Sequence, residues 1–456
     1  MSNQEPAPIK DPFPVPRAVE APSQASLIQT TEVPRRCHVE APLRFSAIVI
    51  ILGTTLNAAF NAIMAVGGHK YPYTSFLFLA DDLFADFLKT IDWFGIVTTW
   101  DGGNEYDGVG LWHLTPLYFL TLFLSAKVIA AIGSATAVFV LVQIAWLSAL
   151  LWVLNNSQKS ARRADRLLFL AAVLVSYPVL FTIQRGNLAG MTVACIGVAV
   201  YLIELGGSRV IGAILLAIAT GLKYTPALFG LSLMGQQNNW RRHLLAFTCL
   251  SAGLVVVPFS LNSWLVEGYS LDRMLTALRY YQEVYVLGPG GIAYGSSLLN
   301  LFKSPFFATN VLLLVAIHQA SMVIFVVGGL LVWWLFRKAL ITRYDYYSLL
   351  AADFVLFTPA IGDYFLLILF VPFLFLPSKF DRDSSSIVLF VGALLCLIPK
   401  HYLFLGQVSM QSIANPLILT ASALAFIFHR SSLGWPRNSG SDNRTSASTL
   451  KTCYPQ

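Results

Sequence analysis

The chain has 456 residues, of which 56% are hydrophobic, 13% aromatic and only 12% charged. Soluble domains carry about 25% charged residues, so this composition excludes a soluble globular protein and indicates a chain embedded in a membrane. The formal net charge of +7 does not indicate nucleic-acid binding, because the basic residues are scattered and form no Lys- and Arg-rich stripe.

Long apolar runs predict spanning helices, and the basic residues between them set the topology. Arg35, Arg36 and Arg44 precede the first run, residues 47–66, and therefore place the N-terminus in the cytoplasm. Further spanning runs are expected at 134–154, 167–183, 188–205, 243–259, 310–336, 347–357, 365–376, 387–398 and 413–428. Every strongly basic connection then lies on one side of the membrane.

Two apolar runs need a different interpretation. Residues 114–128 are expected to lie at the outer interface or to dip into the membrane, because one crossing and not two satisfies the charges on either side. Residues 211–234 are expected to form two short helices broken at their outer end, where Pro226 lacks an amide donor and disfavours a helical Thr225. The sequence thus predicts an all-α polytopic membrane protein, a bundle of about 11–12 membrane helices with both termini inside.

The tails differ in composition from the rest of the chain. We expect disordered cytoplasmic tails at 1–43 and 431–456, and one transmembrane domain over 44–430. Because residues 1–43 are long and rich in proline and charge, we do not interpret them as a cleaved signal peptide.

The first outer loop concentrates acids, with seven carboxylates against two lysines between residues 70 and 113. Asp82 and Asp86 are four residues apart and share one face of a helix, among phenylalanines and leucines. Such a segment lies on the membrane surface with its carboxylates directed into a protein cavity. Partial burial raises a carboxyl pKa and makes a general base, although a solvated outer loop has the same composition.

Two short motifs place cations at the outer ends of helices. Gln184-Arg185-Gly186-Asn187 offers Arg185, and the run from Gly221 to Pro226 offers Lys223. Charged side chains at membrane depth indicate a functional site, and two such cations suit a phosphate or pyrophosphate at the headgroup level. The alternative is that both side chains extend to lipid phosphates.

Two further regions are polar or aromatic within apolar surroundings. Asp363 lies in the turn at residues 358–364, where it is either a helix cap or a ligand. The outer segment 260–308 is rich in tyrosine, which suits sugar recognition but also an interfacial aromatic belt. His and Cys show no metal-ligand spacing and no Gly-rich phosphate loop is present, so we predict no metal and no cofactor.

The order of these motifs over residues 47–428 resembles that of the GT-C membrane glycosyltransferases, and in particular glycosyltransferase family 87, whose members use polyprenol-phosphate-mannose. The resemblance rests on Asp86-Phe87 with the glycine- and tyrosine-containing turn at 103–106, on the 184–187 link, on the Lys-x-x-Pro element at 223–226 and on the 358–364 turn. The chain departs from the family pattern by Arg185 inside the link and by Asp363 where the family often has histidine.

The resemblance implies an integral membrane enzyme that transfers a sugar, expected to be mannose, from a polyprenyl-phosphate donor to a lipid or glycan acceptor, with inversion. The site would face outward from a bacterial plasma membrane. The implied roles are Asp86 as base with Asp82 as alternate, donor-phosphate contacts from Arg185, Lys223, Gln184 and Asn187, and a substrate lining of Tyr224, Tyr281, Asp363 and Tyr364.

A transporter or flippase of lipid-linked saccharides is the alternative function. A transporter spreads polar groups across the membrane midplane, whereas an enzyme of this kind gathers acids and cations at one outer cavity. Glu204 and Asp353 are the main charges inside apolar runs, and we expect both near cytoplasmic ends. That placement favours the enzyme.

Overall fold

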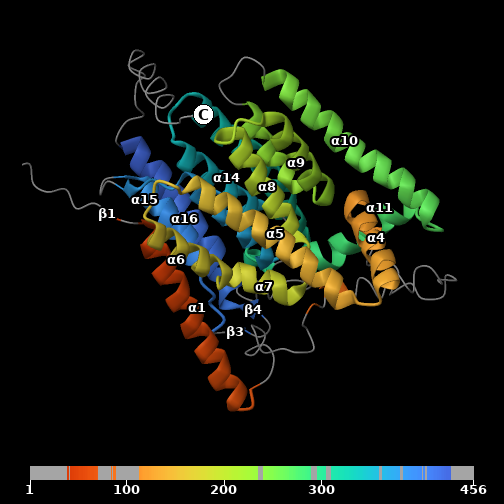
Figure 1. Ribbon diagram of the computed structural model, residues 1–456, viewed down its shortest axis with the longest axis horizontal. Helices are drawn as coiled ribbons and strands as arrows, with labels where there is room; N and C mark the ends of the chain where they lie inside the picture. Colours follow the sequence, from red (N-terminus) through yellow and green to blue (C-terminus); the bar gives the residue numbers. More distant parts are fainter. Residues whose placement is uncertain are drawn as a thin grey trace, which may run out of the picture. The chain divides into compact units, whose positions relative to one another are not determined.

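A computed structural model shows how these segments are arranged (Figure 1). The structure describes residues 39–40, 42–69, 84, 86–88, 112–234, 240–288, 295–303, 310–358, 362–380, 384–402, 404–405 and 408–432. The predicted disordered tails therefore lie almost wholly outside the described residues. The predicted interfacial helix of the first outer loop also lies outside them, except for four of its residues.

Helices make up nearly all of the described chain. Its first half contains α1 (Pro42–Val66), α4 (Pro116–Ile132), α5 (Ala135–Ser157), α6 (Arg163–Leu174), α7 (Tyr177–Arg185), α8 (Ala189–Glu204), α9 (Arg209–Leu222) and the 3₁₀ helix η2 (Thr225–Met234). Its second half contains α10 (Trp240–Leu265), α11 (Leu271–Tyr281), the π-helical η3 (Gln282–Leu287), α12 (Leu298–Lys303), α13 (Val311–Arg337), α14 (Arg343–Phe357), the 3₁₀ helices η5 (Asp363–Phe370) and η6 (Pro372–Phe375), α15 (Ser386–Cys396) and α16 (Met410–Ser432).

The strands among the described residues are four pairs of residues. β1 (Val39–Glu40) is antiparallel to β2 (Lys379–Phe380), and β3 (Phe404–Leu405) is antiparallel to β4 (Val408–Ser409). Each ladder is too short to form a layer, and the β1–β2 ladder joins the chain just before α1 to the segment before α15.

The long helices confirm an all-α polytopic membrane protein. Within the described residues six helical stretches are long and apolar enough to cross a membrane, and six shorter apolar helices accompany them. The apolar windows of α10 and α13 are only 11% and 17% buried. Soluble monomers do not expose apolar surface on this scale, so these two helices face lipid.

Helix breaks occur at the predicted place and at one place that was not predicted. The run 211–234 divides into α9 and η2 around Lys223, as expected from Pro226. The run 167–183, expected as one helix, divides into α6 and α7, with Pro178 in the first turn of α7. Proline has no amide donor for a continuing helix, so the break lies just before it.

The centre of the bundle is formed by α8, α14 and η5. Residues 344–356 of α14 are buried on every side, including the polar side chains of Asp345, Ser348 and Asp353. Glycines bring the helices close together, since a Cβ on Gly190 of α8 would lie 2.5 Å from Trp146 of α5. In Figure 1, α5 and α8 lie between α1 and α10, which are at the edges of the bundle.

The two ends of the bundle differ in charge. Gly190 packs on Trp146 and Gly197 faces Val153, so α5 and α8 run parallel and both end on the same side. That side, called the basic end below, carries the exposed or partly exposed cations Arg44, Lys159, Arg162, Arg163, Arg209, Lys338, Arg343 and Lys379. Two ion pairs hold it together, with Arg44 Nε 2.7 Å from Asp165 and Arg343 Nε 3.3 Å from Glu204.

One predicted charge position differs from the structure. Glu204 lies at the basic end, as expected, where it also accepts a hydrogen bond from Tyr347. Asp353 does not, because it is ten residues beyond the start of α14 and a helix rises about 1.5 Å per residue. It is buried against Gly328 of α13.

Candidate active site

Two phenylalanines fix the described part of the loop between α1 and α4 to the bundle. The amide of Phe84 donates to the carbonyl of Gln184 at 2.6 Å, and the amide of Phe87 donates to the carbonyl of Phe84 at 3.0 Å. Both rings pack on Phe139 of α5, with centroid distances of 4.1 and 5.4 Å. Asp86 is therefore held beside the link between α7 and α8.

Gly186 lets the loop and the link approach closely. Its φ of +70° ends α7 in the left-handed conformation, which costs side-chain-bearing residues about 1–2 kcal/mol. A Cβ here would also lie 2.9 Å from Cβ of Phe87 and 3.2 Å from Cα of Phe84. Only glycine satisfies both conditions.

Asp86 is held by two side chains of the link. Nη2 of Arg185 donates to Oδ1 of Asp86 at 2.5 Å, and Nδ2 of Asn187 donates to Oδ2 at 2.9 Å. The amide oxygen of Asn187 accepts a hydrogen bond from the backbone N–H of Ala189 at 2.9 Å and so satisfies the first amide of α8. The Asp86 and Arg185 side chains remain 24% and 25% exposed, so a substrate can reach the pair.

Lys223 brings a second cation to the same place from the connection between α9 and η2. Its Nζ lies 4.9 Å from the centre of the Tyr118 ring of α4. Tyr118 is in turn within electrostatic range of the Asp86 carboxylate. Burial lowers the pKa of Lys223 to about 8, and the Asp86 carboxylate opposes that shift. The hydroxyl of Thr115 donates to the carbonyl of Leu222 at 2.9 Å and fixes this connection against α4.

Tyrosines surround the two cations. The charge on Asp86 acts on the hydroxyl groups of Tyr118, Tyr281 and Tyr364, which places all three within electrostatic range of the carboxylate. The Tyr281 ring stacks on His113 at 4.3 Å with the ring planes 10° apart. An acid, two cations and aromatic faces thus meet at the end of the bundle opposite the basic end; we call Asp86, Arg185, Asn187 and Lys223 the Asp86 cluster.

Comparison with known protein families agrees with the predicted resemblance. The model of glycosyltransferase family 87 matches residues 112–359, more than half of the chain. The chain belongs to glycosyltransferase family 87. Searches of curated proteins and of solved structures gave no match.

The family 87 match covers only part of the site. It includes Arg185, Asn187 and Lys223, whereas Asp86 precedes it and Tyr364 follows it. The chain is therefore a membrane glycosyltransferase by family, and the roles of its individual side chains rest on the geometry given above.

The structure brings together most but not all of the residues predicted for this glycosyltransferase. Gln184 is buried and contributes its carbonyl to Phe84. Tyr224 is 46% exposed and lies within electrostatic range of Tyr269, a residue of the aromatic cluster between α10 and α11. Asp82 lies outside the described residues.

Asp363 is at the centre of a separate buried network. Its side chain is fully buried and accepts hydrogen bonds from Tyr177 Oη at 2.8 Å, Ser296 Oγ at 2.5 Å and Gln411 Nε2 at 3.0 Å. Asn415 extends the network by donating to Ser296 at 3.0 Å. These donors come from α7, the segment before α12 and α16, so Asp363 joins three distant stretches and orients the adjacent Tyr364.

Sequence reasoning missed two members of the site. Tyr118 and His113 lie in or before an apolar run, where an aromatic residue gives no signal that separates core packing from a ligand contact. Among the described residues no group of three His, Cys, Asp or Glu side chains is placed to hold a metal ion.

Proposed function

We propose that this family 87 glycosyltransferase transfers a sugar, mannose in our proposal, from a polyprenyl-phosphate donor to a lipid or glycan acceptor on the non-cytoplasmic side of the membrane. The observation that carries the proposal is the Asp86 cluster, in which one carboxylate meets two cations that are distant along the chain. The cluster is partly exposed and lies at the bundle end opposite the basic end. By the positive-inside tendency, that end faces outward.

Asp86 serves as the general base. As the acceptor hydroxyl attacks the anomeric carbon from the face opposite the phosphate, its proton passes to a carboxylate oxygen, the new glycosidic bond forms and the sugar–phosphate bond breaks with inversion. Arg185 and Asn187 each hold one oxygen of the carboxylate, which fixes its direction before substrate arrives. This arrangement is the orientation effect expected of a positioned base.

Lys223 and Arg185 stabilise the leaving phosphate. The bond that breaks leaves its electron pair on the polyprenyl phosphate, whose negative charge then grows. Lys223 is the cation available for that charge, and Arg185 lies between the base and the phosphate and shares its five donors between them. Gln184 and Asn187 act indirectly. The carbonyl of Gln184 fixes the loop through Phe84, and the side chain of Asn187 fixes Asp86.

Tyr281 and Tyr364 line the sugar and acceptor subsites. Both lie within electrostatic range of Asp86, and the ring of Tyr281 already stacks on His113. Aromatic faces and hydroxyl groups of this kind bind the apolar faces and hydroxyls of a sugar. Asp363 supports this lining from behind, through its network, and Tyr224 stands at its outer edge.

The flippase alternative has less support. The described charges of the bundle gather at two ends, in the Asp86 cluster and at the basic end, instead of forming a path between them. Asp353 and Asp363 are exceptions: Asp353 is a buried carboxylate against α13, and Asp363 is buried in its own hydrogen-bond network. The family match supports a transferase independently of this distribution.

The test is Asp86→Asn, beside Asp82→Asn, in membranes supplied with labelled polyprenyl-phosphate-mannose. Removing a general base lowers the rate about 100-fold or more, so we expect that loss for Asp86→Asn. Asp272→Asn is the matched control, since Asp272 is an exposed acid of α11 outside the Asp86 cluster. If neither Asp86→Asn nor Asp82→Asn lowers transfer more than about tenfold, roughly 1.4 kcal/mol of barrier, the base assignment is wrong.

A further inference from the structure

A hollow of about 700 Å³ lies at the basic end, away from the Asp86 cluster. Its walls come from three stretches that are distant in the sequence: the first turns of α1, the connection between α5 and α6, and the segment that leads into β2. The β1–β2 ladder and the Arg44–Asp165 ion pair tie these stretches together. The hollow is therefore a fixed feature of the fold.

Cations outnumber acids on its walls. Arg44, Arg162 and Lys379 line it, and Asp165 is the one acid among its lining residues. Asp165 is already neutralised by Arg44 at 2.7 Å. Arg162 and Lys379 are exposed and make no ion pair within the described part of the chain. Arg162 thus remains for an anionic ligand, together with Lys379, whose strand partner in the β1–β2 ladder is Glu40.

An apolar stripe begins at the rim of the same hollow. Phe45 and Ile48 line the hollow, and Leu52 and Leu56 continue the row along α1. These four side chains are 47%, 45%, 57% and 64% exposed, and their spacing of three or four residues puts them on one helix face. A ligand seated on the cations has an apolar track beside it.

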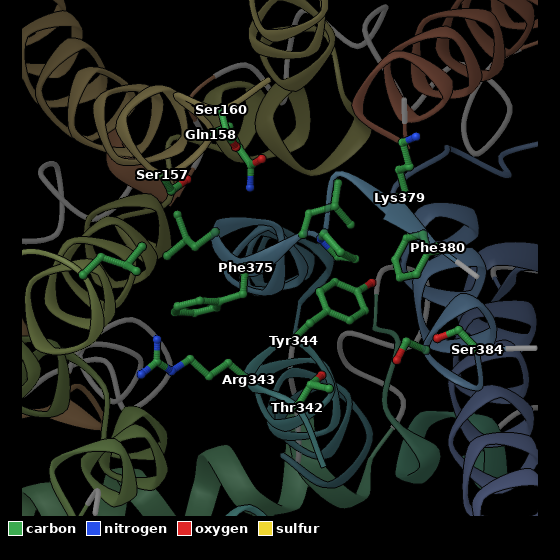
Figure 2. Close-up of a pocket in the computed structure, with 15 residues that line it drawn as sticks. Ser157, Gln158, Ser160, Thr342, Arg343, Tyr344, Phe375, Lys379, Phe380 and Ser384 are labelled. Atoms are coloured by element: carbon green, nitrogen blue, oxygen red, sulfur yellow. The ribbon is translucent and has the colours of Figure 1, made fainter. Parts of the chain in front are cut away.

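A second cavity of about 560 Å³ adjoins the hollow and shares with it Pro377 and three polar residues, Gln158, Ser160 and Lys379 (Figure 2). Figure 2 shows these three side chains along one rim and Arg343 across the cavity. The hydroxyl of Ser160 adds a hydrogen-bond donor to the shared lining. The shared lining therefore offers a cation, an amide and a hydroxyl group.

We propose that this hollow binds the headgroup of an anionic phospholipid, whose acyl chains lie along the Phe45–Leu56 face of α1. Basic pockets between membrane helices on the cytoplasmic side select anionic headgroups. Arg44 stands directly before the apolar run of α1, which places the hollow at the level of lipid phosphates. The stripe belongs to a helix long and apolar enough to span the membrane, so a ligand with acyl chains can stay in the bilayer while its headgroup fills the hollow.

The inference does not rest on the proposed transfer reaction, and its test measures lipid retention instead of activity. The full-length protein in mild detergent is exposed to mixed vesicles of equal phosphatidylglycerol and phosphatidylcholine, and retained lipids are counted by native mass spectrometry. We expect wild type to prefer phosphatidylglycerol. Each cation near a headgroup contributes about fivefold, so Arg162→Gln with Lys379→Gln lowers the preference roughly 25-fold.

The matched control is Arg163→Gln with Lys338→Gln, which removes the same charges from exposed positions outside the hollow. We expect this control to keep the wild-type preference. Equal losses in both double variants would show only a general surface attraction and overturn the proposal. A large excess of inorganic phosphate should leave the lipid bound, and displacement by phosphate would replace the lipid with a soluble anion as the ligand.

Discussion

Asp86 and Asp363 are two carboxylates whose surroundings differ in exposure and in the groups that donate hydrogen bonds to them. Asp86 is 24% exposed and accepts hydrogen bonds from a guanidinium and an amide on one short link. Asp363 is 0% exposed and accepts from three uncharged donors on three different stretches. A carboxylate that is open to the surface can accept a proton from an acceptor hydroxyl group. A carboxylate enclosed by hydrogen-bond donors instead links the segments that carry those donors.

The largest expected contrast is between the two asparagine variants. Asp86→Asn should lower transfer about 100-fold or more with little change in melting temperature, because the carboxylate is partly exposed. Asp363→Asn should do the reverse. The new side-chain NH₂ group faces hydrogen-bond donors, so the free energy of unfolding should fall by about 2 kcal/mol, while transfer by the folded protein should fall only severalfold. Thermal melting in detergent and labelled-sugar transfer measure both effects. Equal profiles for the two variants would remove the distinction.

Gly186→Ala tests the contact that holds Asp86 in place. The new methyl group meets Phe87 at 2.9 Å, so the loop must shift, and we expect transfer to fall at least about tenfold. Gly133→Ala is a matched control, because Gly133 has a φ of +77° but nothing within 4 Å of its added Cβ. The control should therefore lose stability through strain alone and keep its activity. An active Gly186→Ala variant would contradict this account of the loop.

The pH dependence of donor use should sharpen the role of Lys223. With its pKa lowered to about 8, the side chain is charged below that pH and neutral above it. Phosphate binding needs the charge, so kcat/KM for the donor should fall as pH rises through about 8, by about tenfold per pH unit beyond it. Lys223→Arg should abolish this alkaline limb, and Lys127→Arg, at an exposed lysine of α4, should leave it unchanged. A limb that survives in Lys223→Arg belongs to another group.

The smallest contrast concerns two tyrosines predicted together. Tyr281→Phe removes a hydroxyl within electrostatic range of Asp86 and should raise KM about fivefold, as expected for one lost hydrogen bond. Tyr224→Phe removes an exposed hydroxyl near Tyr269 and should change KM less than twofold. Steady-state kinetics on both substrates measures the difference. A larger effect at Tyr224 would move the sugar subsite toward α10 and α11.

Local chemistry made part of the fold and site predictable from the sequence. Lys223 and Pro226 interrupt an apolar run. The proline indicates a break in the helix, and the cation at membrane depth indicates a functional site. Arg185 inside a four-residue link gave a similar signal. These features act over a few residues, so the sequence alone reveals them.

Long-range packing was not predictable in the same way. The burial of Asp363 depends on Tyr177, Ser296 and Gln411, which lie far apart along the chain, and no local pattern announces that they meet. Residues 365–376 were expected as one spanning helix, but the structure has two 3₁₀ helices, at 363–370 and 372–375, separated at Val371 just before Pro372. η5 packs against α8 and α14, and η6 packs against α14, and the sequence alone does not show those contacts.

Helix α7 is a rod of nine residues that carries Tyr177 at its first position and Arg185 at its last. At about 1.5 Å per residue these two positions are about 12 Å apart, so the rod joins the Asp363 network to the guanidinium that grips Asp86. A small tilt at the Tyr177 end is enough to swing Arg185 away from its partner. Substitutions in the buried Asp363 network can therefore alter the contact between Arg185 and Asp86 through α7, while every residue proposed to bind the sugar stays the same.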